Sequence, residues 1–173
     1  PGPWAPPAPL RGHPAGVRAV TFSPDGKSLA TASEDGTARV WDVAKRESRH
    51  TLTGHAGAVT GVAFSPRGQV IATSSADKTL RLWEGATGGE LSNMEEGHSD
   101  VVFGVAFAPS GRQIATVSAD KGVGLWTATL PRVFALQTYA AQPGWTGVAT
   151  VSADGKRIAA VGEGFSILIQ DGA

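Results

Sequence analysis

The sequence contains no cysteine and one methionine, and its 15 Lys and Arg residues balance 15 Asp and Glu residues. Without cysteine, disulfide frameworks, thiolate zinc sites and cysteine nucleophiles are excluded. The net charge of zero opposes a dedicated nucleic-acid binder, because such proteins neutralise phosphates with a basic surface. No run of 18 apolar residues is present, so no segment is apolar enough for a membrane-spanning helix. The first ten residues also lack the basic and apolar parts of a secretory signal, and we expect an intracellular, cytoplasmic protein.

Glycine is abundant instead, with 23 residues, and hydrophobic residues make up 41% of the 173-residue chain. This hydrophobic content suffices for a packed core, and the glycines indicate many tight turns rather than long helices. The length suits one ordinary domain or about four copies of a repeat of roughly 40 residues. Residues 1–9 stand apart, because their five prolines predict an extended linker or a poor outer strand.

From Leu10 onward the sequence repeats itself. Four markers recur with spacings of 42 and 43 residues: a Gly-His pair, a Phe-x-Pro-x-Gly turn, an aspartate and a tryptophan. The three sets are Gly12-His13, 22–26, Asp35 and Trp41; Gly54-His55, 64–68, Asp77 and Trp83; and Gly97-His98, 107–111, Asp120 and Trp126. A fourth and weaker copy keeps the turn at Asp154-Gly155. The period predicts a repeat architecture.

Each copy carries the signals of β-strands. In the first copy an alternating apolar segment runs into the turn at Asp25-Gly26, and a second turn follows at Asp35-Gly36. The strands expected there are residues 17–22, 28–33, 37–43 and 48–53. No segment keeps a helical period long enough to compete. Four antiparallel strands in a unit of about 42 residues are typical of a β-propeller blade.

The first copy reads GH…FSPDG…LATASEDGTARVWD and resembles the repeats of the WD-repeat (WD40) β-propeller family. The resemblance covers the chain from residue 10 to residue 173. It implies an all-β fold of four-stranded antiparallel blades, about four in number, forming a partial ring or part of a larger propeller. The expected blades are residues 10–53, 54–96, 97–136 and 137–173. The last departs from the pattern, with Gly164 at the aspartate position, Gln170 at the tryptophan position and no Gly-His pair before it.

In this family the loop histidine, a Ser or Thr of the second strand, the turn aspartate and the third-strand tryptophan are hydrogen-bonded to one another. The resemblance implies such a structural network in the first three blades. Two hydroxyls in each blade are candidates, because they differ by two positions and share one strand face. The members are His13, Thr31 or Ser33, Asp35 and Trp41; His55, Thr73 or Ser75, Asp77 and Trp83; and His98, Thr116 or Ser118, Asp120 and Trp126.

A Ser-His-Asp set also invites a catalytic interpretation. We favour the structural one, because a buried imidazole needs hydrogen-bond partners and three copies of one triad are ordinary in a repeat but unusual in an enzyme. We therefore expect no catalytic residues and no cofactor. No metal site is expected either, since the three histidines occupy equivalent places in separate blades.

The resemblance also implies a binding face, formed by the loop into the first strand and the turn between the second and third strands. A protein or peptide partner is expected there, in contact with Arg18, Glu34, Thr60, Phe103 and Trp145. Phe103 and Trp145 are of a residue type that anchors interfaces, although each could instead pack inward. The alternatives to this scaffold function are a nucleic-acid-binding propeller and a propeller hydrolase.

A partial ring would expose strand edges and apolar blade faces. We therefore expect further WD blades in the same chain, or a second copy of the chain, to cover them.

Overall fold

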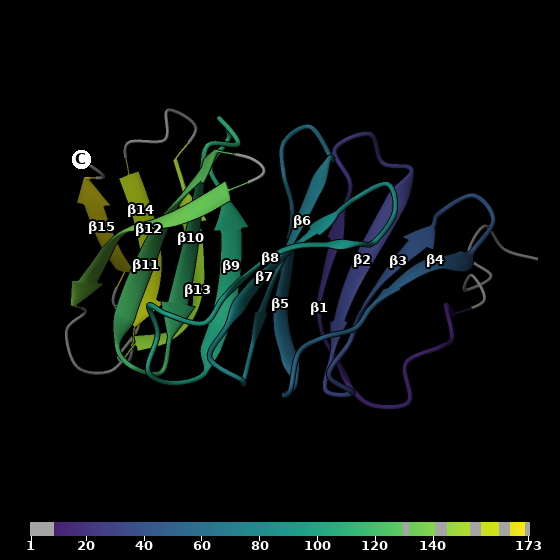
Figure 1. Cartoon of the computed structure of the whole chain (residues 1–173), viewed down its shortest axis with the longest axis horizontal. Coiled ribbons are helices and arrows are strands. Elements are labelled where there is room, and N and C mark those ends of the chain that lie inside the picture. Colours follow the sequence, from purple (N-terminus) through teal and green to yellow (C-terminus); the bar gives the residue numbers. More distant parts are fainter. Residues whose placement is uncertain (1–8, 130–131, 141–144, 153–156, 163–166, 172–173) are drawn as a thin grey trace, which may run out of the picture.

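The computed structural model describes residues 9–129, 132–140, 145–152, 157–162 and 167–171 of the chain. These residues form 15 β-strands and contain no helix. The strands lie in four antiparallel sheets that stand side by side in chain order (Figure 1). The expected all-β architecture of antiparallel blades is therefore confirmed. The predicted linker or outer strand at residues 1–9 falls almost wholly outside the described residues and stays a prediction.

Each sheet is a meander in which sequential strands are neighbours. The first sheet contains β1 (Val17–Phe22), β2 (Ser28–Ser33), β3 (Ala38–Asp42) and β4 (Glu47–Leu52). The second contains β5 (Val59–Phe64), β6 (Val70–Ser75), β7 (Leu80–Glu84) and β8 (Glu90–Met94). The third contains β9 (Val102–Phe107), β10 (Gln113–Ser118), β11 (Gly122–Thr129) and β12 (Arg132–Ala140). The fourth contains β13 (Trp145–Val151), β14 (Arg157–Gly162) and β15 (Ile167–Asp171).

The sheet boundaries differ from the expected blades at one place. Strand β12 pairs with β11 as far as Ala140, opposite Gly122, so the third sheet extends beyond the expected limit at residue 136. The difference arises because the Gly-His marker that separates the earlier copies is missing before the fourth. Without that marker, the sequence does not indicate where the outer strand ends.

Neighbouring sheets pack face to face, and a tryptophan fills each of two interfaces. Trp83 of the second sheet is 2% exposed and joins a buried cluster with residues of the first sheet, Ala30, Ala32, Val40 and Leu52. Trp126 of the third sheet joins another buried cluster with residues of the second sheet, namely Val70, Ala72, Leu80 and Leu82. The alanines leave room on each second strand for the next blade. Burying one such aromatic side chain contributes about 3 kcal/mol.

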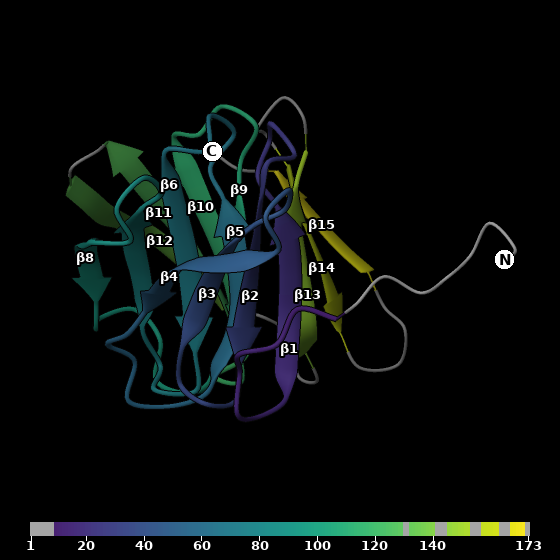
Figure 2. The same ribbon diagram turned by 90° about the vertical axis from the view of Figure 1, so that its right-hand side faces the viewer.

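The first sheet has an apolar face that no other described residue covers. Val20 and Phe22 are each 62% exposed and Val17 is 54% exposed, whereas the equivalent Val59 and Val62 of the second sheet are 0% and 7% exposed. Within the described ranges, no strand of the first sheet makes an extensive contact with a strand of the fourth. The sheets therefore form an open arc, with β1 at the side that faces the viewer in Figure 2.

Candidate functional site

Each of the first three blades contains a chain of side-chain hydrogen bonds between its loop and its sheet. In the first blade, His13 Nδ1 lies 2.7 Å from Asp35 Oδ2, and His13 Nε2 lies 2.7 Å from Thr31 Oγ1. The same threonine oxygen accepts a 2.8 Å hydrogen bond from Trp41 Nε1. The next two blades repeat these contacts at 2.7 to 2.9 Å, through His55, Asp77, Thr73 and Trp83 and through His98, Asp120, Thr116 and Trp126.

The chemistry of the four groups fixes the direction of two of the three bonds, and the third follows from the protonation of the imidazole. The indole nitrogen can only donate, so Thr31 Oγ1 accepts from Trp41 and has its own proton left to donate. The Asp35 carboxylate can only accept, so His13 carries its proton on Nδ1. When the imidazole is neutral, His13 Nε2 is the acceptor for the threonine proton, and both ring nitrogens are used.

The threonines, and not the serines, complete this chain. Ser33, Ser75 and Ser118 instead accept from the backbone N–H of the turn aspartate at 3.1 to 3.2 Å. Their hydroxyls donate to a carbonyl of the loop before the first strand at 3.0 to 3.5 Å. Of the two hydroxyls left open in each blade, the threonine is therefore the partner of the histidine, and placing Ser33, Ser75 or Ser118 there is wrong. The difference follows from position, because each serine ends its strand beside the turn and lies next to the aspartate backbone.

This placement removes the chemical basis of a Ser-His-Asp triad. A serine nucleophile needs the imidazole as its base, within hydrogen-bond reach. In all three blades the nitrogen that would act as base accepts from a threonine that is itself bonded to a buried indole. Of the histidines in these networks, none is left to activate a nucleophile.

Two threonines that the sequence reasoning did not single out also belong to the network. Thr37 Oγ1 donates to Asp35 Oδ1 at 2.6 Å, and Thr79 Oγ1 donates to Asp77 Oδ1 at 2.7 Å. They hold the carboxylate oxygen that the histidine leaves free. The signal in the sequence is an Asp-x-Thr pattern in the first two copies, a common side-chain turn. The third copy has Gly122 there, and only its backbone N–H donates, at 2.7 Å.

In the folded blades the pKa of each network aspartate is lowered, and in the second blade also that of the histidine. Burial alone would raise the pKa of Asp77, but hydrogen bonds from Thr79, His55 and the backbone outweigh it and lower the pKa from 3.8 to about 2. The same balance lowers the pKa of Asp35 and Asp120. For His55, burial outweighs the attraction of Asp77 and lowers the pKa below its ordinary value of 6.5.

The fourth sheet has the backbone of a blade without this network. Gln170 lies opposite Ile158 in the register of β14 and β15, just as Trp41 lies opposite Leu29 in the first sheet. Ala160, two residues after Ile158, therefore takes the place of the network threonine. Neither an alanine nor a glutamine can replace the hydroxyl and the indole. The aspartate position, Gly164, lies outside the described residues.

A β-bulge recurs at one position in the first strand of each of the first three blades. The pairing between the first and second strands skips one residue, and the skipped residues are Arg18, Thr60 and Phe103. Bulges re-aim a side chain and release it from the ladder. All three positions are among the predicted partner contacts. We call the end of the blades that carries Arg18, Glu34, Thr60 and Phe103 the bulge end.

At the bulge end of the first blade, two predicted contacts bind each other. An Arg18 guanidinium nitrogen lies 2.6 Å from Glu34 Oε1, and the side chains are 60% and 42% exposed. Such an exposed ion pair contributes little to stability, at most about 1 kcal/mol. A partner with its own charged groups can therefore exchange places with either side chain at small cost.

Thr60 is engaged in a contact between blades. Its hydroxyl donates to the backbone carbonyl of Val102 in β9 and lies 3.1 Å from Ser74 Oγ. The only hydroxyl proton of Thr60 is thus used within the molecule. This bond connects the second blade to the third, a role that the sequence reasoning did not assign to it.

The two aromatic candidates differ in what the structure describes. Phe103 has 36% of its surface exposed at the bulge of β9, so it does not fold fully inward. Trp145 begins β13 with its backbone opposite Gly162. The side chain of Trp145 lies outside the described residues, and its predicted role stays a prediction.

Other kinds of site were searched for in the described part of the chain. No group of three or more His, Asp or Glu side chains there is arranged to hold a metal ion. No helix there has the length and apolar character needed to cross a membrane.

The first three blades are antiparallel four-stranded sheets, and in each of them hydrogen bonds link a His, an Asp, a Thr and a Trp. These features define a propeller of the WD type. A family model for "WD domain, G-beta repeat" matches residues 4–42, 46–84 and 89–127. These segments cover more than half of the 173 residues. The chain belongs to the WD-repeat family.

Individual relatives match over about one repeat. The chain is 55% identical over 38 residues to apoptotic protease-activating factor 1 of Mus musculus, which is 22% of this chain and 3% of that protein. It is 56% identical over 34 residues to the target of rapamycin complex subunit wat1 of Schizosaccharomyces pombe, or 20% and 11%. It is 55% identical over 31 residues to the general transcriptional corepressor TUP1 of Saccharomyces cerevisiae, or 18% and 4%. The matches thus span a small part of each relative and identify the repeat.

Proposed function

We propose that this chain is a non-catalytic scaffold that binds a protein or peptide at its bulge end. The observation that carries the proposal is the recurrence of the bulge, which presents a different side chain from each of three blades at one end of the molecule. Binding residues are often held in this way on loops and irregular positions of a rigid framework. Membership of a family of interaction repeats supports the same conclusion.

Two side chains at the bulge end have the chemistry of an interface anchor. Phe103 offers a partly exposed aromatic ring, and Arg18 offers a guanidinium whose present ion pair with Glu34 is exposed and weak. Aromatic residues and arginine are enriched among the residues that dominate binding energy. We therefore assign Phe103 and Arg18 the largest contributions, and Thr60 a smaller one because its hydroxyl is already bonded.

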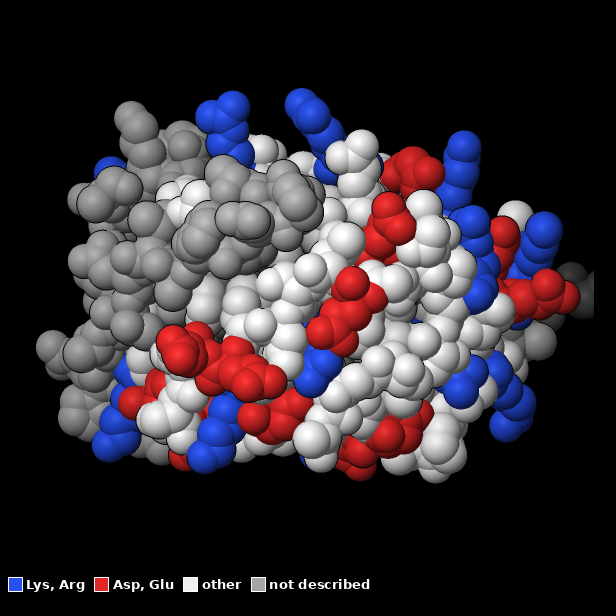
Figure 3. Space-filling model, viewed as in Figure 1, with Lys and Arg blue, Asp and Glu red and all other residues white. Residues whose placement is uncertain are grey.

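The two alternative functions have less support. In Figure 3, lysine and arginine side chains are interspersed with aspartate and glutamate over the described surface in view, and do not form a single basic field. A nucleic-acid-binding surface needs such a field. A hydrolase would need a free nucleophile and base, whereas the blade histidines are saturated by their network partners.

The proposal is tested by selecting peptides from a random display library on the immobilised chain and measuring their dissociation constants. Phe103→Ala and Arg18→Ala should each weaken a selected peptide about tenfold or more, because truncating an anchor residue costs more than 1 kcal/mol. Circular dichroism should show unchanged folding, since both side chains are exposed. We expect the same loss of binding for Trp145→Ala.

Val43→Ala and Arg112→Ala are matched controls. Val43 is 39% exposed, close to the exposure of Phe103, but lies in the β3–β4 turn at the other end of its blade. Arg112 likewise lies away from the bulge end, in the β9–β10 turn. Peptides that bind the bulge-end variants and the controls equally well would contradict the proposal, as would a library that yields no binder.

A further inference from the structure

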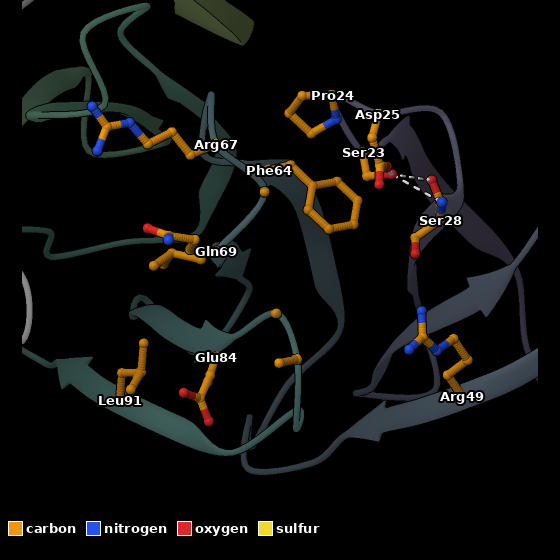
Figure 4. Close-up of a pocket in the computed structure, with 14 residues that line it drawn as sticks. Ser23, Pro24, Asp25, Ser28, Arg49, Phe64, Arg67, Gln69, Glu84 and Leu91 are labelled. Atoms are coloured by element: carbon orange, nitrogen blue, oxygen red, sulfur yellow. Dashed lines mark hydrogen bonds between the residues drawn. The ribbon is translucent and has the colours of Figure 1, made fainter.

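A groove of about 670 Å³ lies between the first and second blades (Figure 4). Its walls include residues of the β1–β2, β5–β6 and β7–β8 turns, together with the outer strands β4 and β8. In a meander these turns lie at the end opposite the β2–β3 turn, so the groove opens away from the bulge end. Its volume falls in the range of sites that hold small ligands or a few side chains, roughly 300–1,000 Å³.

The backbone fixes the shape of this groove. Gly85 donates its N–H to Gln69 O at 2.8 Å, and a Cβ added at Gly85 would lie 2.5 Å from Gly68 O. A Cβ added at Gly68 would in turn meet Pro24 of the first blade at 3.5 Å. Only glycine permits the first of these close approaches. The turns that form the groove are therefore held together before any ligand binds, which limits the entropy lost on binding.

Two side chains that enter the groove are themselves bulge residues of the outer strands. The pairing of β3 with β4 skips Arg49, and the pairing of β7 with β8 skips Leu91. Both therefore project from the ladder, and Figure 4 shows them on opposite sides of the Phe64 ring. Leu91 is 37% exposed, and Val70 at the base of the groove is 2% exposed. An arginine on one side thus faces Leu91 on the other, where Gln69 and Glu84 also line the groove (Figure 4).

The charged groups of the groove are not equally available. Asp25 accepts hydrogen bonds from Ser23 Oγ at 2.6 Å and from Lys27 N at 3.0 Å. Glu84 accepts from Thr87 Oγ1 at 2.6 Å. Arg49 has no hydrogen bond or ion pair with another described residue. Its charge is one of the smaller causes that lower the pKa of Asp42. Arg67, which also lines the groove, has no such bond to another described residue either, but Figure 4 shows its side chain pointing away from Phe64. The charged groups of the groove that lack an internal partner are therefore guanidiniums, whose preferred partner is a carboxylate.

We propose that the groove binds a short protein segment in which an apolar side chain stands next to a carboxylate. The apolar side chain packs on Phe64 and Leu91, and the carboxylate pairs with Arg49. This is a second binding surface at the opposite end of the blades, and it does not rest on the function proposed for the bulge end. The two surfaces would let one arc of blades hold two partners or two segments of one partner.

The test uses fluorescein-labelled hexapeptides that combine leucine or phenylalanine with adjacent glutamates, and identical peptides with glutamine in place of glutamate. Fluorescence anisotropy gives the dissociation constants with the 173-residue chain, and NMR chemical shifts locate the contact. We expect glutamate peptides to shift the signals of Val70 and Leu91. We also expect the glutamine peptides to bind about tenfold or more weakly, because a hydrogen bond from a guanidinium to a carboxylate is stronger than one to a neutral amide.

Matched variants make the outcome specific. Arg49→Glu should weaken the glutamate peptides at least tenfold, whereas Arg112→Glu, the same charge change in the β9–β10 turn, should leave them within a factor of two. Leu91→Ser should weaken binding, while Val43→Ser, of similar exposure, should not. If Arg49→Glu fails to fold, Arg49→Gln removes the charge with less change.

Three results would overturn the proposal: no binding of any glutamate peptide at millimolar concentration, equal binding of glutamate and glutamine peptides, or equal effects of Arg49→Glu and Arg112→Glu. A failure of the bulge-end proposal looks different, because it concerns peptides that respond to Phe103→Ala. Peptides bound in the groove should bind the Phe103→Ala variant unchanged.

Discussion

One threonine hydroxyl in each complete blade stands between two nitrogen heterocycles and serves both. Thr73 accepts from Trp83 and donates to His55, so both its proton and a lone pair are used in a site with no exposed surface. Removing that oxygen leaves a buried indole N–H and a buried imidazole nitrogen without partners. Thr79, in the same blade, donates to one oxygen of Asp77 and lies 3.2 Å from His55 Nδ1, and both the carboxylate and the imidazole keep other partners without it.

Thr73→Val should therefore destabilise the protein by about 3 kcal/mol, and Thr79→Val by about 1 kcal/mol, because an unsatisfied buried group costs roughly 1–3 kcal/mol. The substitution is the same and of similar volume at both positions, so the difference reports the number of stranded partners. Urea denaturation followed by tryptophan fluorescence measures both values. Equal losses for the two variants would show that Thr73, between the indole and the imidazole, contributes no more to stability than Thr79.

Acidification should weaken the fold in two steps. The pKa of His55 is lowered in the folded state, so the unfolded chain takes up its proton first as the pH falls below 6.5 and stability decreases. The folded pKa of Asp77 is about 2 against 3.8, so its contribution is complete above pH 3.8 and is lost as the pH falls toward 2. Urea midpoints across this range measure the effect.

The Asp77→Asn variant separates the two steps of the acid response. It lacks one titrating carboxyl, so its loss of stability between pH 3.8 and pH 2 should be smaller than that of the unaltered chain. A free energy of unfolding that stays constant from neutral pH down to pH 3.8 would contradict the assignment of a neutral, buried His55.

At the scale of strands and turns, much of the molecule follows from residue patterns. Strands β1 and β2 have the bounds that alternation and turn residues predict, and the network histidines, aspartates and tryptophans meet as the resemblance to the WD-repeat family implies. The choice of Thr31 over Ser33 did not follow, because both lie on one face and differ only in their distance from the turn. The skipped positions such as Phe103 were not visible either, since a bulge depends on pairing with another strand.

The groove beside Arg49 shows the same limit at an interface between blades. Arg49 and Leu91 lie 42 residues apart in the sequence, and each looks like an ordinary residue of an outer strand. They face one cavity only because two sheets are stacked with their bulges in register. Likewise, the hydrogen bond from Thr60 to Val102 joins two repeats, and the sequence of neither repeat alone predicts it.

The fourth blade should open before the others. It lacks the threonine, the indole and the loop histidine that tie a loop to its sheet elsewhere, and a lost buried hydrogen-bond network lowers the free energy of local opening. Amide hydrogen exchange in β13–β15 should be about tenfold or more faster than in β5–β7. Thr73→Val should raise the amide exchange rates of the second blade toward those of the fourth. Similar protection of all four blades would rule out a role of the network in local stability.

At the scale of the whole molecule, the open arc leaves an apolar face on β1. The equivalent face of every later sheet with described side chains is covered by the sheet before it. An exposed row of Val17, Val20 and Phe22 favours association with another surface of the same kind. A second copy of the chain or a further blade would supply that surface.

Light scattering of the isolated chain should therefore give a mass above 17.7 kDa at micromolar concentration. Val20→Asp and Phe22→Asp should lower the mass toward that of one chain, because they place charge on the apolar face. Val43→Asp, at another exposed valine, should have no such effect. A folded single chain without any substitution would show that the β1 face remains uncovered in solution.

The bulge in each first strand has a further consequence for engineering. The residue that the ladder skips need not satisfy strand pairing, and Arg18 and Phe103 already differ greatly in size and charge at equivalent positions. Randomising positions 18 and 103 together would vary the side chains available for recognition while the sheets and their hydrogen-bond networks stay unchanged. Thr60 would be kept, because its hydroxyl connects two blades. The packed blades could thus serve as a scaffold for combinatorial selection, in which the residues at positions 18 and 103 are varied and the rest of the structure is kept.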